Sequence, residues 1–153
     1  MHSHSQVFQE NPQQCANEIF TYGYSIQNET SKALPTDFKD LVGTPPPMTV
    51  VEQAAYFYRC ALEIMPGHSL ALGYLGNLIE TKQILALPSD FPDSKMPDTP
   101  AAQAAMLYRR AIGVQSNNFL ALDRLAGLIQ LEKVTAQTED FPENLEILEK
   151  GPA

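Results

Sequence analysis

Few side chains in this sequence have the type and spacing that chemistry requires. The three histidines are His2, His4 and His68, and none is paired with cysteines at the spacing of a zinc site. The sequence also holds no phosphate-binding glycine loop and no nucleophile motif. We therefore predict no catalytic residue, no metal site and no cofactor, and a protein that is not an enzyme.

The two cysteines are the remaining reactive pair. Cys15 and Cys60 fall near the start of one expected helix and near the end of its antiparallel partner, so a disulfide needs both suitable geometry and an oxidising compartment. We expect two buried thiols instead. Residues 1–6 show no basic segment followed by an apolar stretch, so we expect a cytoplasmic protein, with secretion as the alternative. The sequon Asn28-Glu29-Thr30 matters only if the protein is secreted.

Composition and charge favour a single globular domain and disfavour binding to nucleic acids or membranes. The chain has 153 residues, of which 44% are hydrophobic and 18% charged, which suits one domain with a hydrophobic core. Its net charge of −8 disfavours nucleic acids and anionic membranes, because both attract basic faces. No apolar run approaches the ~20 residues that span a bilayer. The expected partners are proteins or peptides, other copies of the chain included, with no nucleic acid and no membrane insertion.

A repeat of 50 residues organises the chain. Segment 54–62 (AAYFYRCAL) matches 104–112 (AAMLYRRAI), and segment 70–76 (LALGYLG) matches 120–126 (LALDRLA), both at a register of 50 without a gap. A phenylalanine also recurs in each Asp-containing loop, 53 and then 50 residues apart, at Phe38, Phe91 and Phe141. The repeated unit is therefore a helix, a Pro/Asp loop with a phenylalanine, and a second helix.

Periodicity and end signals predict five helices. Apolar residues recur at i, i+3 and i+7 along the segments concerned. Asn11-Pro12 and Thr99-Pro100 are typical of an N-cap followed by proline at the first helical position, Thr49 with Glu52 fits a capping box, and Pro66-Gly67 ends one helix before the next. The expected helices are 12–28, 50–64, 68–82, 100–114 and 118–133.

The order of small and large residues resembles the tetratricopeptide (TPR) repeat, seen across a repeat junction. The residues that carry the resemblance are Ala54, Tyr58, Ala61 and Pro66, then Leu72, Leu75-Gly76 and Ile79. The later copy is Ala104, Tyr108, Ala111, Leu122, Leu125-Ala126 and Ile129, with Ser116 where the proline would be, and the first copy of the second part is Ile19, Tyr22-Gly23 and Ile26. The resemblance covers residues 12–133. It departs from the ~34-residue family repeat because 16 to 19 extra residues enter the turn inside each unit.

This resemblance implies an all-α fold, a TPR-like right-handed helical solenoid of about two and a half repeats with long Pro/Asp-rich loops inside each repeat. Glycine and alanine would meet where the paired helices cross and allow their close approach. We expect one domain at 11–150 between a flexible polar arm at 1–10 and a tail at 151–153. Its repeat units are expected at 12–64, 68–114 and 118–150.

The long loops are expected to be held down by their aromatic residues. We predict that the loop anchors are Phe38, Phe91 and Phe141, and that the loop aspartate caps a turn. The alternative is that the loops make repeated contacts with a partner or a neighbouring subunit. Calcium binding by Asp37 with Asp40, or by Asp90 with Asp93, is disfavoured because the spacing of EF-hand ligands is absent.

The resemblance implies a concave partner-binding groove lined by the first helix of each repeat. The expected groove residues are Asn17, Phe20, Thr21, Tyr24, Leu70, Tyr74, Asn77, Glu80, Asp123, Arg124 and Gln130. Aromatic rings flanked by amides suit an extended peptide or a helix, which predicts a non-catalytic interaction module or adaptor. The alternative is that Phe20 and Tyr24 pack under the N-terminal arm. A carboxylate clamp of the kind found in chaperone adaptors is disfavoured, because Arg124 alone matches its basic positions.

The third unit has an incomplete second helix in this register, so the helix at 118–133 would expose one face. We expect the segment Glu143–Lys150, with Leu145, Ile147 and Leu148, to fold back as a cap. The alternative function is a structural subunit that self-assembles head-to-tail, through its terminal helices, into an oligomer or filament.

Overall fold

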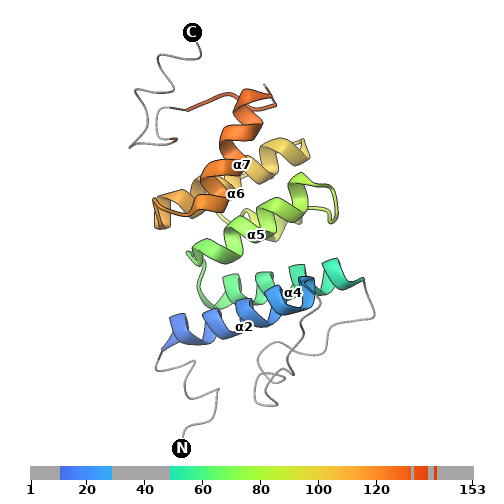
Figure 1. Cartoon of the computed structure of the whole chain (residues 1–153), viewed down its shortest axis with the longest axis vertical. Helices are drawn as coiled ribbons and strands as arrows, with labels where there is room; N and C mark the ends of the chain where they lie inside the picture. Colours follow the sequence, from blue (N-terminus) through green and yellow to red (C-terminus); the bar gives the residue numbers. More distant parts are fainter. Residues whose placement is uncertain (1–10, 29–48, 132, 138–139, 141–153) are drawn as a thin grey trace, which may run out of the picture.

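The computed structural model describes residues 11–28, 49–131, 133–137 and 140, and helices make up most of this part of the chain. The helices are α2 (Pro12–Gln27), α4 (Val50–Ile64), α5 (Ser69–Glu80), the short 3-10 helix η2 (Pro88–Asp90), α6 (Pro100–Val114) and α7 (Phe119–Gln130) (Figure 1). These described residues contain no strand. The all-α class and the five helices expected from the sequence are confirmed, although α5 and α7 each end a few residues earlier than expected.

A side-chain cap begins each of the five α-helices. The side chains of Asn11, Thr49, His68, Thr99 and Asn118 each accept a hydrogen bond from the backbone N–H three residues later, at 3.1 or 3.2 Å. Such caps satisfy donors that the first helical turn leaves unpaired. The caps at Asn11, Thr49 and Thr99 are therefore confirmed. His68 and Asn118 occupy equivalent positions, 50 residues apart.

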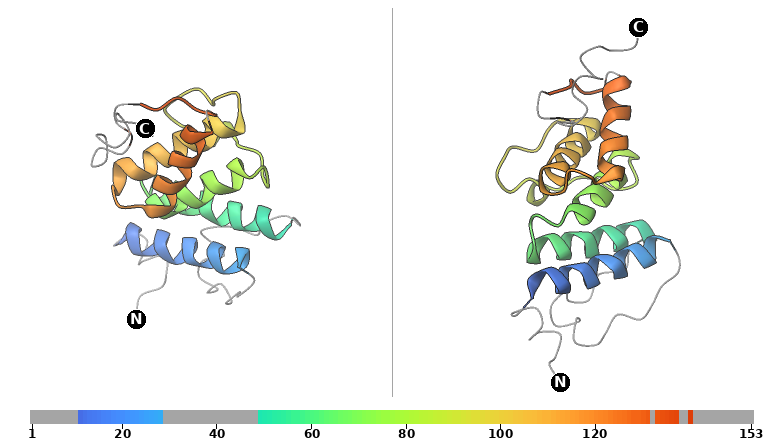
Figure 2. Two further views of the ribbon diagram at one scale, coloured as in Figure 1. Left: turned by 45° about the horizontal axis from the view of Figure 1, so that its top comes forward. Right: turned by 60° about the vertical axis from the view of Figure 1, so that its left-hand side comes forward.

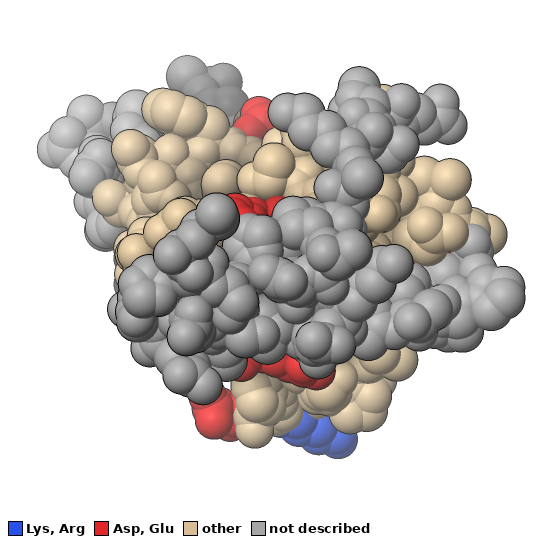
Figure 3. All heavy atoms as spheres, turned by 90° about the horizontal axis from the view of Figure 1, so that it is seen from below, with Lys and Arg blue, Asp and Glu red and all other residues tan. Residues whose placement is uncertain are grey.

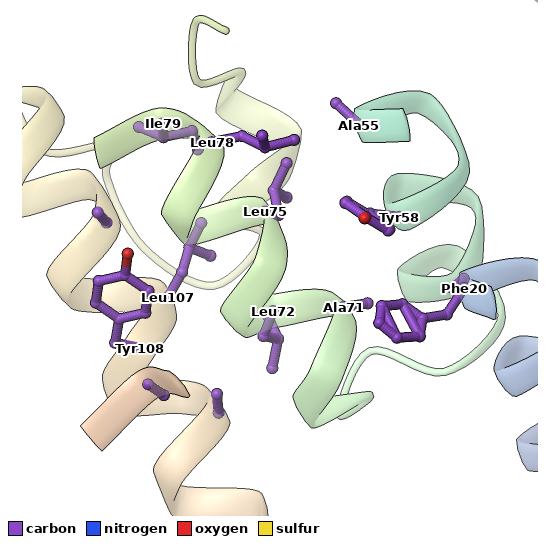
Figure 4. Packing of buried hydrophobic residues seen from close by; sticks show 14 of the residues in the cluster. Phe20, Ala55, Tyr58, Ala71, Leu72, Leu75, Leu78, Ile79, Leu107 and Tyr108 are labelled. Atoms are coloured by element: carbon purple, nitrogen blue, oxygen red, sulfur yellow. The ribbon is translucent and has the colours of Figure 1, made fainter. Parts of the chain in front are cut away.

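The helices are stacked in chain order along the longest axis of the molecule. In Figures 1 and 2, α2 and α4 run antiparallel at one end, α5 and α6 follow, and α7 lies at the other end. The interior of the stack is apolar on both sides of α5. Figure 4 shows Leu75 and Leu78 on the side of α5 toward Tyr58, whereas Leu107 and Tyr108 lie on the opposite side. All five of these side chains are buried.

Glycine lets the paired helices approach closely. A Cβ atom on Gly23 would lie 3.0 Å from Phe57 Cβ, across the contact between α2 and α4. A Cβ atom on Gly76 would lie 2.9 Å from Tyr108 Cε1, across the contact between α5 and α6. The distance at Gly76 is shorter than real Cβ contacts and that at Gly23 is tighter than most of them, so a larger residue at either crossing would force its neighbours to shift. Gly76 follows Gly23 by 53 residues, which is also the offset from Phe38 to Phe91.

Arginines hold the long loops onto the second helix of each preceding pair. Arg59 donates from Nε to Asp90 Oδ1 at 2.9 Å and from Nη2 to Asp90 Oδ2 at 3.0 Å and Leu85 O at 3.1 Å. Arg109 makes the same three bonds 50 residues later, to both carboxylate oxygens of Asp140 and to Thr135 O. A bidentate guanidinium–carboxylate pair fixes both orientation and position.

The loop aspartates also cap a turn. Asp90 Oδ2 accepts the backbone N–H of Leu87 at 2.8 Å, and Asp140 Oδ2 accepts that of Gln137 at 2.9 Å. Beside the first turn, Phe91 is buried to 3% exposure in the hydrophobic core. The loop aspartate therefore has a second role, as the partner of an arginine, that the sequence did not predict.

Several predictions fall outside the described residues. These are the loop anchors Phe38 and Phe141, the arm at 1–10, the cap at Glu143–Lys150 and the tail at 151–153. They stay predictions.

Candidate functional site

Phe20 belongs to the core and not to an open groove. It is 6% exposed, and its ring centroid lies 5.3 Å from that of Tyr58, 5.4 Å from that of His68 and 5.4 Å from that of Tyr74. The prediction that Phe20 is a groove residue is therefore wrong. Helical phase placed Phe20 on the same side of α2 as Tyr24, but α4 and α5 close over the earlier turn.

Tyr24 and Tyr74 extend the group of rings around Phe20 to the surface. Tyr24 is 42% exposed, and its ring meets that of half-buried Tyr74 edge to face, with centroids 5.3 Å apart and planes at 81°. Such pairs add about 0.5–1.5 kcal/mol beyond their buried area. Burial, with the neighbouring Tyr24, raises the pKa of Tyr74. Two successive layers thus present one aromatic surface, with exposed Thr21 beside Tyr24 on α2.

The exposed Asn17 is tied to the next layer by His68. Asn17 Oδ1 lies 2.6 Å from His68 Nε2, while His68 Nδ1 accepts the N–H of Ala71 at 3.1 Å. Because Nδ1 is an acceptor, Nε2 carries the proton and donates to Asn17. Burial lowers the pKa of His68, which favours this neutral form. This pair joins α2 to the start of α5.

Asn77 carries the unsatisfied polar atom of this face. Its Oδ1 is buried and accepts no hydrogen bond from the described residues. Leaving a buried acceptor unpaired costs about 1–3 kcal/mol, so such an atom indicates a missing donor. Asn77 lies almost one turn after Tyr74 on α5, and Leu70 lies about one turn before it, 45% exposed. A ligand with an N–H or O–H group would supply the bond.

Glu80, which is half-exposed at the end of α5, joins α5 to α6. Its Oε1 accepts the hydroxyl of Tyr108 from α6 at 2.6 Å. Gln27, the last residue of α2, accepts the hydroxyl of Tyr58 from α4 in the same way. Burial, reinforced by Glu80, raises the pKa of Tyr108. One oxygen of Glu80 is therefore used between two helices, while its place in the groove stays a prediction. Gln130, its exposed counterpart on α7, stands at the same position.

The face becomes charged toward α7. Asp123 is exposed and Arg124 half-buried, at the register positions that Gly73 and Tyr74 hold on α5. The positive charge of Arg124 is close enough to oppose the rise in the pKa of Tyr108. The predicted groove residues therefore run from an aromatic end on α2 and α5 to a polar end on α7.

Both cysteines are free thiols. Cys15 is fully buried, whereas Cys60 is half-buried, which corrects the expectation of two buried thiols. Burial raises the pKa of Cys15, and burial with the nearby Glu63 raises that of Cys60 to about 12. Thiols with raised pKa values are poor nucleophiles at neutral pH. In the described part of the chain, no three His, Cys, Asp or Glu residues come close enough to hold a metal ion.

Two equivalent cavities lie beside the arginines that the sequence analysis missed. One has a volume of about 640 Å³ and lies between α4 and the loop after α5, with Tyr56, Arg59 and Ile84 in its lining. The other has a volume of about 390 Å³, with Met106, Arg109 and Val134 in its lining. The repetition of an arginine at the same register was the sequence signal for these positions.

The described residues include seven Lys or Arg and nine Asp or Glu, and two of the acidic residues, Asp90 and Asp140, are buried. In the end view of Figure 3, acidic side chains of the described residues appear at several places and basic ones at one edge. The described helices include none with the length and hydrophobicity to cross a bilayer.

Comparison of the chain with protein-family models, with curated proteins and with solved structures finds no match.

Proposed function

We propose that the chain is a TPR-like right-handed helical solenoid that works as a non-catalytic protein–protein interaction module or adaptor. It binds a segment of a partner protein across the face formed by Tyr24, Tyr74 and Asn77. The solenoid and the binding face are supported by separate sets of contacts.

Contacts that recur at the repeat register support the solenoid. The hydroxyl of Tyr58 bonds to the end of α2, and the hydroxyl of Tyr108 bonds to the end of α5. Arg59 and Arg109 hold successive loops with the same three hydrogen bonds. Repetition of whole interaction sets, and not of single residues, is what a stack of equivalent units predicts.

The observation that carries the binding proposal is the unpartnered Asn77 Oδ1 next to the exposed aromatic pair Tyr24 and Tyr74. An extended peptide offers backbone N–H groups, one of which would bond to this oxygen once docking shifts the side chains that cover it. Tyrosines supply large contact areas at low entropic cost and are enriched where binding energy concentrates. The net charge of −8 favours a neutral or basic partner segment.

Head-to-tail assembly has less support. On α5, Ala71 and Leu78 are buried within the stack. The corresponding residues of α2 are Glu18 and Ser25. A further layer stacked on α2 would have to remove the carboxylate of Glu18 from water, which costs free energy. The adaptor is therefore the function that this arrangement supports best.

Selection from a random peptide library displayed on phage tests the binding face. Peptides enriched on the wild-type chain are then titrated into Tyr24→Ala and into the control Leu85→Ala, which removes a side chain that is 85% exposed on the loop after α5. We expect the Tyr24 variant to lose at least tenfold in affinity and the control to bind as the wild type does. A selection without enrichment, or equal affinity for both variants, would exclude this face.

A further inference from the structure

One side of α7 has the residues that α5 uses to hold α6. Gly76 lies against Leu107 and Tyr108 of α6, and Leu72 and Ile79 extend the same side of α5 by one turn each way. All three of these α5 positions are buried. Their counterparts on α7, 50 residues later, are all half-exposed: Leu122, Ala126 and Ile129.

The hydrogen-bond acceptor at the end of the first helix of each pair is also repeated. Gln27 and Glu80 end their helices and accept the hydroxyls of Tyr58 and Tyr108. Gln130 ends α7 at the same register and is exposed. No tyrosine within the described segments bonds to it. An apolar stripe and a hydrogen-bond acceptor thus lie side by side on α7. The same arrangement on α2 packs against α4, and on α5 it packs against α6.

The helix that fits is defined by the two that already occupy such sites. Both α4 and α6 carry the pattern Ala-x3-Tyr-x2-Ala, and all six of these residues are buried: Ala54, Tyr58, Ala61, Ala104, Tyr108 and Ala111. Helix α6 runs antiparallel to α5, because Ser69 at the start of α5 bonds to Gln115 at the end of α6, while Glu80 bonds to Tyr108. A helix with this pattern on α7 would place its small residues near Ala126 and its tyrosine near Gln130.

We propose that this side of α7 docks an amphipathic helix of a partner protein that carries the Ala-x3-Tyr-x2-Ala pattern and runs antiparallel to α7. The segment 141–150 of the chain contains neither alanine nor tyrosine, so it lacks this pattern, but the cap expected from it would cover the same side of α7 and would prevent the peptide from binding. The site is distinct from the aromatic face, because it is centred on Ala126 and continues the helix-pairing series of the stack.

A synthetic peptide with the sequence of residues 98–115, which includes α6 and its cap, is the probe. Titrated into the isotope-labelled full chain, it is expected to bind saturably and to shift the amide signals of Ala126, Ile129 and Gln130. The variant Ala126→Leu fills the crossing position and should abolish binding. The control Gly113→Leu adds the same side chain on α6, where a Cβ meets nothing within 4 Å, and should leave binding unchanged.

A second arm tests the hydrogen bond itself. The peptide with Tyr108→Phe is expected to bind about threefold to tenfold more weakly to the wild-type chain. It should bind as well as the unmodified peptide to the chain with Gln130→Ala, because the acceptor is then gone. If the contact were only apolar, Tyr108→Phe would weaken binding equally to the wild-type chain and to the Gln130→Ala chain.

Three results would overturn the proposal. One is the absence of saturable binding, and another is equal binding to the Ala126→Leu chain. The third is a dimer of the wild-type chain that Ala126→Leu dissociates, because a second copy would then be the occupant. Loss of peptide binding in Tyr24→Ala, with Ala126→Leu unaffected, would place the peptide on the aromatic face instead, so failure of this proposal is distinct from failure of the proposed function.

Discussion

The hydroxyl of Tyr108, in the middle of α6, donates a 2.6 Å hydrogen bond to Oε1 of Glu80, the last residue of α5. This bond joins the two helices at the point where Gly76 lets them approach. The first pair repeats it with Tyr58 and Gln27. Each pair of helices is thus closed by one small residue and one polar bond.

Removing the hydroxyl should destabilise the fold. Tyr108→Phe leaves a partly buried carboxylate without its donor, and we expect the free energy of unfolding in urea to fall by about 1–3 kcal/mol. Glu80→Gln is the matched control, because an amide already accepts the equivalent bond at Gln27, and it should change stability by less than about 1 kcal/mol. Equal stability of Tyr108→Phe and the wild type would contradict this role for the bond.

The same substitution should have opposite effects at two helical glycines. Gly76→Ala would place a Cβ 2.9 Å from Tyr108 Cε1 and should destabilise the protein by about 1–3 kcal/mol. Gly127→Ala, where a Cβ meets nothing within 4 Å, should stabilise it by up to about 1 kcal/mol, because alanine favours a helix. Thermal unfolding of both variants checks the signs, and destabilisation by Gly127→Ala would show that α7 has an unrecognised contact there.

The arginine that holds the loop should be costly to remove. The side chain of Asp90 is 2% exposed, so Arg59→Met leaves a buried carboxylate without its charged partner, and we expect a loss of about 3 kcal/mol. The double variant with Asp90→Asn should recover part of that loss, because the uncompensated charge is removed. A double-mutant cycle in denaturant measures the coupling, and additive effects would rule out this pairing.

His68 should make stability sensitive to mild acid. Burial lowers its pKa in the folded chain below the ordinary 6.5, so the unfolded chain binds the proton more readily. The contribution is complete above pH 6.5 and is lost as the pH falls from there through the folded pKa. His68→Asn, which copies the cap Asn118, should show a smaller decline in unfolding free energy between pH 7 and 5. An equal decline would assign the effect to other groups.

Helix positions and the repeat could be predicted because their signals are local. The caps Asn11, Thr49 and Thr99 and the register of 50 residues are visible in short segments. The Arg59–Asp90 pair spans 31 residues and depends on where the loop returns, so neither periodicity nor end signals could indicate it. The cap at His68 was missed because histidine is not among the usual N-cap residues.

The candidate face was predictable in outline and not in detail. Tyr24 and Tyr74 do lie together, but helical phase alone could not separate the exposed Tyr24 from the buried Phe20, one turn earlier. That distinction depends on how α4 and α5 close over α2. Glu80 fell on the expected side of α5, yet its carboxylate is used by Tyr108, which is a contact between helices.

The most direct test of the proposed function is a calorimetric titration of a library-selected peptide into the wild-type chain and into Asn77→Leu. Removing a buried oxygen that has no partner should leave the unfolding free energy unchanged or raised, while an N–H group of the peptide loses the acceptor to which it would bond. We predict a chain at least as stable as the wild type that binds the peptide about threefold to tenfold more weakly. Unchanged affinity in a stable Asn77→Leu chain would contradict binding at this face.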